Sequence, residues 1–510
     1  MLLRRLTQSL LLLTVSAGLA SPALETTTTT KKHSAPKSAA TADGTIRRAP
    51  IAKPFKTRAK KGRKLKPSSK TASTRSGTPA PTPNPHATTT IPTRTTVSLH
   101  TKSPTAVASR EVLIDRIQRT LASPKAGIEN PRALRPFFDQ LRQLEIDPKS
   151  QLVRVIQFGD SHTAGDSFTG ALRTLFQQKF GDGGAGFSFA GYPFAGYHIH
   201  GTKRAQSTGW LALGTHLNDI GDAMVGMGGV SLSTNAAGNW VSLDADATSL
   251  QVQYLIQPNG GSIEIRDNDT LIATVSTASS DTAAPDSAGH FDTPVEPGPH
   301  HFEVLTVDQA PVRLLGLSTE NSAGVTYEAA GINGAEASLF LRWNEALQQT
   351  LLTEINPALI VLSYGTNEAG DRNWTEEGYA AMFQRIIERV RRLAPNASIL
   401  VVGPPDRALR AGRRAWRPFA GVDRIVAAQR TVCRKMNCAY WDQRSRMGGL
   451  GSMRDWVSIS WAQPDHTHFT GEGYTELASA LFADITEQYD RYEPPLTRAQ
   501  GETNENNKTK

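Results

Sequence analysis

Three short segments of the sequence carry residue types that can perform nucleophilic chemistry. They are Gly159-Asp160-Ser161-His162, Gly365-Thr366-Asn367-Glu368 and Asp465-His466-Thr467-His468. A serine hydroxyl becomes an effective nucleophile when a histidine takes its proton and a carboxylate holds that histidine in one tautomer. Asp465 precedes His468 by three residues and can reach its ring within one turn. We therefore expect Ser161, His468 and Asp465 to form a catalytic triad, with the Asn367 amide as a donor to an oxyanion.

The residues around Ser161 narrow the kind of hydrolase. Thr163 stands where a Gly-x-Ser-x-Gly motif would have its second glycine, which argues against the nucleophile elbow of ordinary α/β-hydrolases. Ser161 leads directly into a predicted helix, whose dipole and free N–H groups favour a developing negative charge.

Apolar runs and helical patterns alternate around these segments and predict the elements that position them. Residues 152–158, 358–363, 398–402 and 439–442 are typical of strands, and residues 111–122, 131–144, 168–180, 335–354, 379–393, 422–436 and 473–489 of helices. This alternation predicts an α/β fold with a doubly wound parallel sheet. In such a sheet, catalytic groups collect beyond the carboxyl ends of the strands.

A different texture lies between the two alternating series. Residues 200–315 show short alternating segments broken by Gly, Pro, Asn and Asp. This pattern predicts an inserted all-β sandwich. We therefore divide the hydrolase domain into residues 106–199 and 316–492, on either side of the insert, and assign residues 493–510 to a polar tail.

Four segments, in order, resemble the sequence blocks of SGNH (GDSL-type) hydrolases. Gly159-Asp160-Ser161 is similar to the first block, Ile332-Asn333-Gly334-Ala335 to the second, Gly365-Thr366-Asn367-Glu368 to the third and Asp465-x-x-His468 to the last. The resemblance implies a serine esterase with the triad above. It also implies an oxyanion hole made by the N–H groups of Ser161 and Gly334 and the Asn367 side chain, and no metal or other cofactor.

Longer strings point to a narrower group. Residues 157–166 and 331–335 resemble bacterial peptidoglycan O-acetylesterases, which also carry a carbohydrate-binding-like β-domain inserted in the SGNH fold. The resemblance implies hydrolysis of the acetyl ester on the C6 hydroxyl of muramoyl residues. Three alternatives stay open. They are an acetylesterase or acetyltransferase for another polysaccharide, a dormant polymer-binding protein of the cell envelope, and a phospholipase, although no long apolar lid segment is evident.

The first hundred residues predict export and a spacer. Residues 1–22, with Arg4 and Arg5 before an apolar run, are typical of a signal peptide, so we expect a secreted or periplasmic protein. Residues 23–105 are rich in Thr, Ser, Pro and Lys and predict a disordered basic linker. Residues 26–102 hold 17 Lys and Arg against one acid, Asp43, so residues 103–510 are net acidic although the whole chain is +9. On an exported protein we expect this arm to be a solvated spacer or to contact anionic envelope polymers or lipid headgroups, not nucleic acid. No other segment is apolar enough to cross a membrane.

Several remaining residues have weaker signals. Cys433 and Cys438 could form one local disulfide or stay reduced. His198 and His200 have the alternating spacing of metal ligands but lack an evident third ligand. The glycine-rich run 181–186 predicts a turn that could line a substrate groove. Four aromatic residues in the insert or just before it could stack on sugars or be buried in a core: Tyr192, Trp210, Trp240 and Tyr254.

Overall fold

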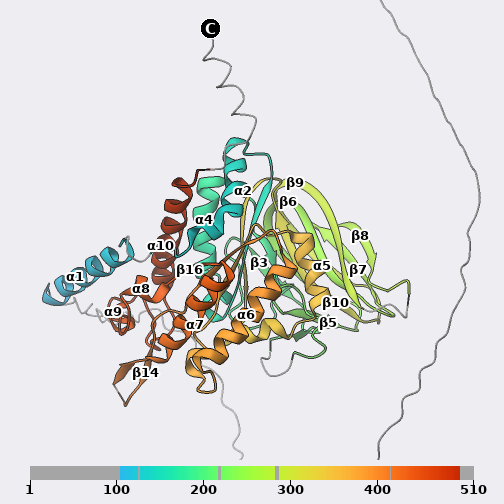
Figure 1. Ribbon diagram of the computed structural model, residues 1–510. Helices are drawn as coiled ribbons and strands as arrows, with labels where there is room; N and C mark the ends of the chain where they lie inside the picture. Colours follow the sequence, from blue (N-terminus) through green and yellow to red (C-terminus); the bar gives the residue numbers. More distant parts are fainter. Residues whose placement is uncertain (1–103, 124–126, 216–219, 282–285, 414, 494–510) are drawn as a thin grey trace, which may run out of the picture. The chain divides into compact units, whose positions relative to one another are not determined.

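The computed structural model describes residues 104–123, 127–215, 220–281, 286–413 and 415–493 (Figure 1). The chain divides into units 1–96 and 97–510, and all described residues lie in the second. The predicted signal peptide, nearly all of the predicted linker and all but the first residue of the predicted tail lie outside the described residues.

A five-stranded parallel sheet forms the centre of the hydrolase part, as predicted. Its strands are β1 (Leu152–Gly159), β11 (Gly324–Gly331), β12 (Leu359–Ser363), β13 (Ser398–Val402) and β16 (Ala439–Trp441), in the order β11-β1-β12-β13-β16. All four neighbouring pairs are parallel. Four of the strands were expected, but β11 was not. It pairs with β1 from Leu152↔Gly324 to Gly159↔Gly331.

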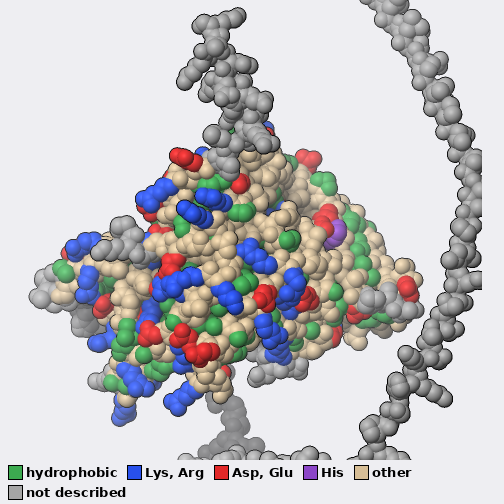
Figure 2. Space-filling model, in the orientation of Figure 1, with side chains coloured by type: hydrophobic (Ala, Val, Ile, Leu, Met, Phe, Trp, Pro, Cys, Tyr) green, Lys and Arg blue, Asp and Glu red, His purple; other side chains and the backbone are tan. Residues whose placement is uncertain are grey.

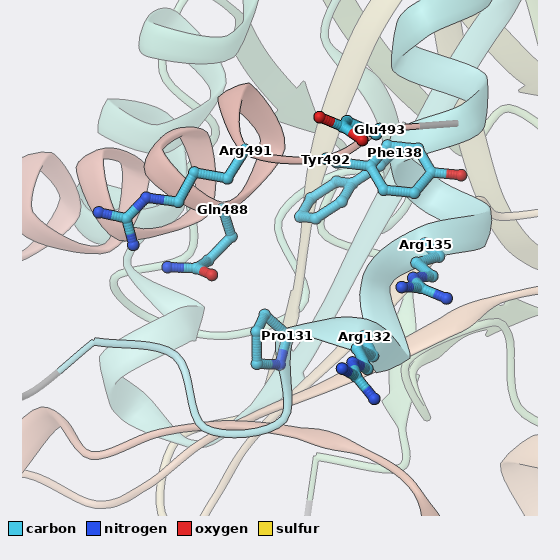
Figure 3. Close-up of a pocket in the computed structure, with 8 residues that line it drawn as sticks. All are labelled: Pro131, Arg132, Arg135, Phe138, Gln488, Arg491, Tyr492 and Glu493. Atoms are coloured by element: carbon cyan, nitrogen blue, oxygen red, sulfur yellow. The ribbon is translucent and has the colours of Figure 1, made fainter. Parts of the chain in front are cut away.

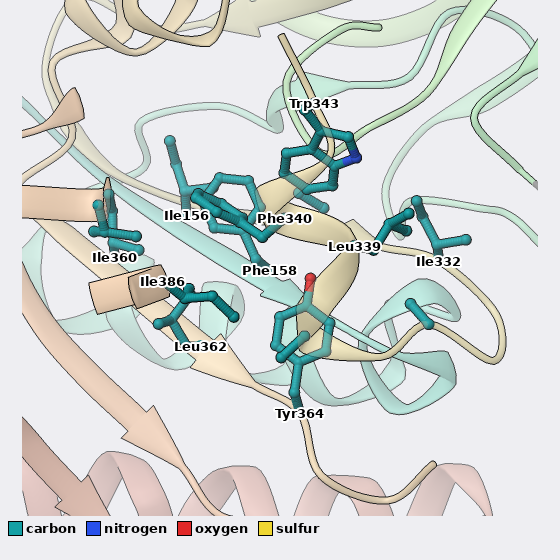
Figure 4. Packing of buried hydrophobic residues seen from close by; sticks show 14 of the residues in the cluster. Ile156, Phe158, Ile332, Leu339, Phe340, Trp343, Ile360, Leu362, Tyr364 and Ile386 are labelled. Atoms are coloured by element: carbon teal, nitrogen blue, oxygen red, sulfur yellow. The ribbon is translucent and has the colours of Figure 1, made fainter. Parts of the chain in front are cut away.

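Helices cover both faces of this sheet, so its strands are buried on both sides. Alternate residues of β12 face opposite layers, with Ile360 and Leu362 in one apolar cluster and Leu359 and Val361 in the other. The first cluster, part of which Figure 4 shows, includes side chains of α5 (Glu345–Ile355), α6 (Glu376–Leu393) and α7 (Gly421–Met436). The second includes side chains of α1 (Pro104–Leu121), α2 (Arg135–Ile146), α4 (Ser167–Phe180) and α10 (Gly471–Asp490).

Short helices join these elements. They are η2 (Pro131–Leu134), α3 (Ser161–Ala164), η3 (Ala337–Leu341), η4 (Glu368–Gly370), α8 (Gln443–Met447) and α9 (Met453–Ser458). The single helix predicted over residues 335–354 is wrong. The chain forms η3, breaks, and restarts as α5, because the Asn344 side chain accepts the N–H of Leu347 (2.9 Å) and caps a new helix.

Nine strands form a second sheet with antiparallel pairing. They are β2 (Gly186–Ser188), β3 (Lys203–Gln206), β4 (Leu211–Leu213), β5 (Ser231–Thr234), β6 (Trp240–Ile256), β7 (Ser262–Asp267), β8 (Thr270–Ser276), β9 (Ser287–Thr306) and β10 (Val312–Glu320). The predicted all-β character is present, but the predicted sandwich is not confirmed. The long strands β6 and β9 pair from Trp240↔Leu305 to Ile256↔Ser287, so that all nine strands belong to one hydrogen-bonded sheet.

A small hairpin completes the architecture. Strands β14 (Ala408–Arg410) and β15 (Trp416–Pro418) pair with each other and lie between β13 and α7 in the sequence. Among the described residues, no helix has the length and apolar character that a membrane span needs.

Candidate active site

Ser161 lies at the carboxyl end of β1, where the chain turns sharply into α3. A Cβ at Gly159 would lie 2.1 Å from Thr163 Oγ1 and 2.8 Å from the Ser363 carbonyl oxygen, so the turn requires glycine there. Asp160 Oδ1 accepts the N–H of His162 (2.9 Å) and caps the helix. The turn therefore leaves Ser161 at the first helical position, half-buried.

The structure brings together the three residues of the predicted triad. Ser161 Oγ lies 2.9 Å from His468 Nε2, and His468 Nδ1 lies 2.7 Å from Asp465 Oδ2. Asp465 Oδ1 accepts the backbone N–H groups of Thr467 (2.9 Å) and His468 (3.0 Å). The carboxylate thus holds Nδ1 as the protonated nitrogen and leaves Nε2 to accept the proton of the serine hydroxyl.

Asp465 is suited to balance positive charge on His468. Partial burial works against its ionisation, but hydrogen bonds from the His468 side chain and from the backbone N–H groups of His468 and Thr467 lower the pKa of Asp465. The carboxylate therefore remains ionised when the imidazole takes a proton.

The groups predicted for the oxyanion hole follow three adjacent strands. The order β11-β1-β12 places the loops that carry Gly334, Ser161 and Asn367 at one edge of the sheet. Gly334 has a φ of 76° in a turn closed by the Ala335 N–H and the Ile332 carbonyl (3.1 Å). Within the described part of the chain, neither the Ser161 nor the Gly334 N–H has a backbone acceptor.

Two side chains tie the loop of Asn367 to the loop of Gly334. Asn367 Nδ2 donates to the Ala335 carbonyl (2.9 Å), which uses one of its two protons. The fully buried Glu368 accepts the N–H of Ala337 (2.8 Å). Burial raises the pKa of Glu368 to about 8, against the opposing effect of the Ala337 N–H, so this carboxyl is protonated at neutral pH.

Glu368→Gln is expected to keep esterase activity at pH 7, whereas Glu368→Ala should lower kcat by about 10- to 100-fold because the loops lose their register. Glutamine retains an acceptor for the Ala337 N–H but cannot ionise.

Since the raised pKa belongs to the folded state, ionisation of Glu368 costs stability as the pH rises from about 4 to 8. Melting temperatures between pH 5 and 9 should therefore fall in the native protein relative to Glu368→Gln, and parallel curves would contradict this assignment.

His162 is a neighbour of the site that the sequence did not single out. Its ring centroid lies 5.3 Å from that of His468, and its Nδ1 lies 2.9 Å from the Tyr474 hydroxyl. Burial, reinforced by the charges of His468 and Arg407, lowers the pKa of His162 to about 3. His162 therefore stays neutral, and its uncharged ring packs beside the ring of His468. Only the adjacency to Ser161 could have signalled this role.

Asp160 is buried behind the nucleophile. Burial raises its pKa to about 6, although hydrogen bonds from the His162 N–H and the Thr366 side chain oppose the shift. The Asp160 N–H donates to the Ser363 carbonyl at the end of β12 (3.4 Å), so the nucleophile turn is also tied to the strand that leads to Asn367.

The other histidines singled out from the sequence have hydrogen-bond partners outside the triad. His200 Nδ1 contacts the Asp166 carbonyl (2.9 Å) and His198 Nδ1 the Gly196 carbonyl (3.1 Å). Within the described ranges, the one group of side chains close enough to share a metal ion comprises His290, Asp292 and Glu354, all exposed, and includes neither of these histidines.

The structure also places the cysteines, the aromatic residues of the insert and the glycine run. Cys433 and Cys438 are buried free thiols. Tyr254 belongs to the core of the second sheet, Trp210 packs against that core and Tyr192 is exposed, so sugar stacking stays a prediction. The run 181–186 connects α4 to β2, and the Gly183 N–H donates to the Val325 carbonyl (3.2 Å) near the start of β11. This is the amino edge of the sheet, opposite Ser161, so the predicted groove wall is wrong.

A cavity of about 360 Å³ also lies away from the triad (Figure 3). It is lined by Pro131, Arg132, Arg135, Phe138, Gln488, Arg491, Tyr492 and Glu493. The Phe137 N–H donates to Ser398 Oγ at the start of β13 (3.2 Å), which puts the beginning of α2 at the amino edge of the sheet. The cavity therefore does not belong to the site of Ser161.

Comparisons with known proteins bear on the class of enzyme. Residues 301–475 match the model of the GDSL-like Lipase/Acylhydrolase family, a segment that contains Gly334, Asn367, Asp465 and His468 and begins after Ser161. A solved peptidoglycan O-acetylesterase is similar at a TM-score of 0.61 and 25% identity, over 70% of this chain and 97% of that chain. A family two carbohydrate esterase from Cellvibrio japonicus matches 57% of this chain and 99% of its own at 11% identity, but its TM-score of 0.23 supports no conclusion. No curated protein matches the chain by sequence.

The parallel sheet, the Ser161–His468–Asp465 arrangement and the family match together define a hydrolytic esterase of the SGNH type. The predicted resemblance to peptidoglycan O-acetylesterases is confirmed by the structural match.

Proposed function

We propose that this protein is an exported esterase that removes acetyl groups from a cell-envelope polysaccharide, with peptidoglycan as its substrate. The observation that carries the proposal is the unbroken chain of contacts from Ser161 Oγ through His468 to Asp465, at 2.9 and 2.7 Å. These distances lie in the range that proton transfer to a general base requires.

The reaction follows from these contacts. Ser161 Oγ attacks the acetyl carbonyl carbon while His468 Nε2 takes the hydroxyl proton, and Asp465 stabilises the resulting imidazolium. The N–H groups of Ser161 and Gly334 and the free amide proton of Asn367 stabilise the oxyanion. His468 then protonates the departing sugar oxygen, which leaves an acetyl–serine ester. Water attacks this ester with His468 again as base, releases acetate and restores the Ser161 hydroxyl.

The choice of polymer rests on the resemblance of residues 157–166 and 331–335 and on the similar O-acetylesterase structure. The second sheet, whose strands lie between β1 and β11 in the sequence, would position the polymer. We propose export through the signal peptide 1–22, and we propose that the basic segment 23–105 holds the enzyme near anionic envelope polymers.

Acetate release from O-acetylated peptidoglycan by the purified full chain tests the proposal. We expect release from this polymer, a lower rate on acetylated xylan, and p-nitrophenol release from p-nitrophenyl acetate. All three should disappear in Ser161→Ala. Hydrolysis of xylan but not of peptidoglycan would keep the esterase and overturn the substrate. A folded protein inactive on all three esters, with or without an added sugar acceptor, would overturn the function.

A further inference from the structure

An arginine-rich hairpin borders the candidate active site. The segment from Arg407 to Arg417 contains five arginines in eleven residues and includes β14 and the start of β15, while Arg414 lies outside the described residues. It follows β13, so it extends from the same carboxyl edge of the parallel sheet as Ser161. Lys and Arg side chains protrude at the lower left of Figure 2, where Figure 1 places β14.

The base of the hairpin is fixed to both loops of the active site. Arg407 Nη1 donates to the Thr366 carbonyl (2.6 Å), directly before Asn367. The Ala408 N–H donates to the carbonyl of His466 (3.1 Å), which lies between Asp465 and His468. The Trp416 ring stacks on the His466 ring, with centroids 4.1 Å apart and planes at 25°. The base of the hairpin is therefore held against the loops that carry Asn367 and the Asp465–His468 pair.

Among the described residues, three arginines of the hairpin have no acidic partner. Arg410, Arg413 and Arg417 are exposed, and no ion pair joins any of them to a carboxylate in the described part of the chain. Arg410 donates to the carbonyls of Gly412 (3.3 Å) and Arg413 (3.1 Å) and so stiffens the turn. By contrast, the nearby Arg444 pairs with Asp406 and Asp423. The guanidinium groups of Arg413 and Arg417 are therefore available to bind an anion, and guanidinium matches the geometry of carboxylates.

We propose that Arg413 and Arg417 bind carboxylate groups of the polymer next to the acetylated sugar, and that the enzyme thereby favours acidic over neutral acetylated polymers. This inference rests on the proposed function and specifies its substrate class. The carboxylates could belong to peptides attached to the glycan or to the sugars themselves. In either case the hairpin would hold the polymer chain while Ser161 attacks the ester. Hydrolysis of a small neutral ester would not depend on the charge of the hairpin.

The test compares the double variant Arg413→Gln/Arg417→Gln with the native full chain. At sub-saturating O-acetylated peptidoglycan, we expect acetate release to fall roughly tenfold, since two exposed ion pairs are lost. Hydrolysis of p-nitrophenyl acetate and of neutral acetylated xylan should change less than twofold. Arg413→Lys/Arg417→Lys should recover part of the lost rate because it keeps the charge.

A matched control removes the same charge elsewhere. Arg132 and Arg135 are exposed at the amino edge of the sheet, so Arg132→Gln/Arg135→Gln should leave all three rates unchanged. An equal loss in this control would show a general effect of net charge and overturn the inference. So would an unchanged peptidoglycan rate in the hairpin variant.

Binding measured without catalysis separates this inference from the proposed function. In a Ser161→Ala background, co-sedimentation with peptidoglycan should weaken when Arg413 and Arg417 are replaced, even if the esterase assignment fails. Two further substrates identify the source of the carboxylates. Removal of the peptides should abolish the effect of the hairpin if they supply the carboxylates, and an acetylated uronic-acid polymer should show the effect if the sugars do. No effect with any acidic polymer would overturn the inference.

Discussion

Replacing Ser161 with alanine should lower kcat/KM for an acetyl ester by about four to six orders of magnitude. The substitution removes the oxygen that lies 2.9 Å from His468 Nε2 and leaves only the oxyanion groups to assist attack by water. His468→Ala should cause a loss of similar size. Because the two residues act as one unit, the double variant should be no worse than either single variant. Initial rates with p-nitrophenyl acetate measure all three.

Ser167→Ala is the matched control. Ser167 lies six residues further on, at the start of α4, and its hydroxyl has one long hydrogen bond to the Gly165 carbonyl (3.5 Å). Its loss should change the rate by less than about twofold and the melting temperature very little. If Ser161→Ala kept more than a hundredth of the native rate with an unchanged melting temperature, Ser161 would not be the nucleophile.

The positions of the predicted site residues could be anticipated because local signals coincide there. A buried apolar run ends at Gly159, the next residues can cap a helix, and the chain repeats this strand-to-loop pattern before Asn367. Parallel strands bring such loops to one edge whatever their order. Asp465 and His468 are only three residues apart, so the local backbone alone can bring their side chains into contact.

The parts that were missed depend on contacts between distant segments. Strand β11 has the sequence Gly-Val-Thr-Tyr-Glu-Ala-Ala-Gly and is fully buried. It was not predicted because Glu328 and the small residues interrupt the apolar run that is typical of a buried strand. The contact of Arg407 with the Thr366 carbonyl joins residues 41 positions apart. The sandwich was inferred from the short spacing of polar breaks, but β6 continues through its break with a register shift between Ala247 and Ser249. No local pattern reveals such a continuation.

Asp166→Ala should destabilise the fold by about 3–5 kcal/mol, the largest stability effect that we expect near the site. Asp166 is fully buried, and its Oδ2 lies 2.5 Å from Arg173 Nη2 and 2.8 Å from the backbone nitrogen of His200. Its Oδ1 accepts the Thr169 hydroxyl (2.6 Å). Alanine at position 166, five residues after Ser161, would leave the charge of Arg173 uncompensated in the core. Urea unfolding at pH 7 measures the loss. Asp490→Ala, which removes an exposed pair with Lys179, should cost less than about 1 kcal/mol.

The pH dependence of this difference identifies its cause. Burial opposes ionisation of Asp166, but the charge of Arg173 and the hydrogen bonds from His200, Arg173 and Thr169 lower its pKa to about 2. Because this pKa lies below the unfolded value of about 3.9, the ion pair stabilises the native state above pH 4. That stabilisation is lost as the pH falls from about 4 to 2. Because Asp166 also raises the pKa of His200, the stability gap between the native protein and Asp166→Ala should widen from pH 7 to 5 and then shrink by pH 3. A gap that stayed constant down to pH 2 would mean that the missing packing of Asp166, and not its charge, destabilises the variant.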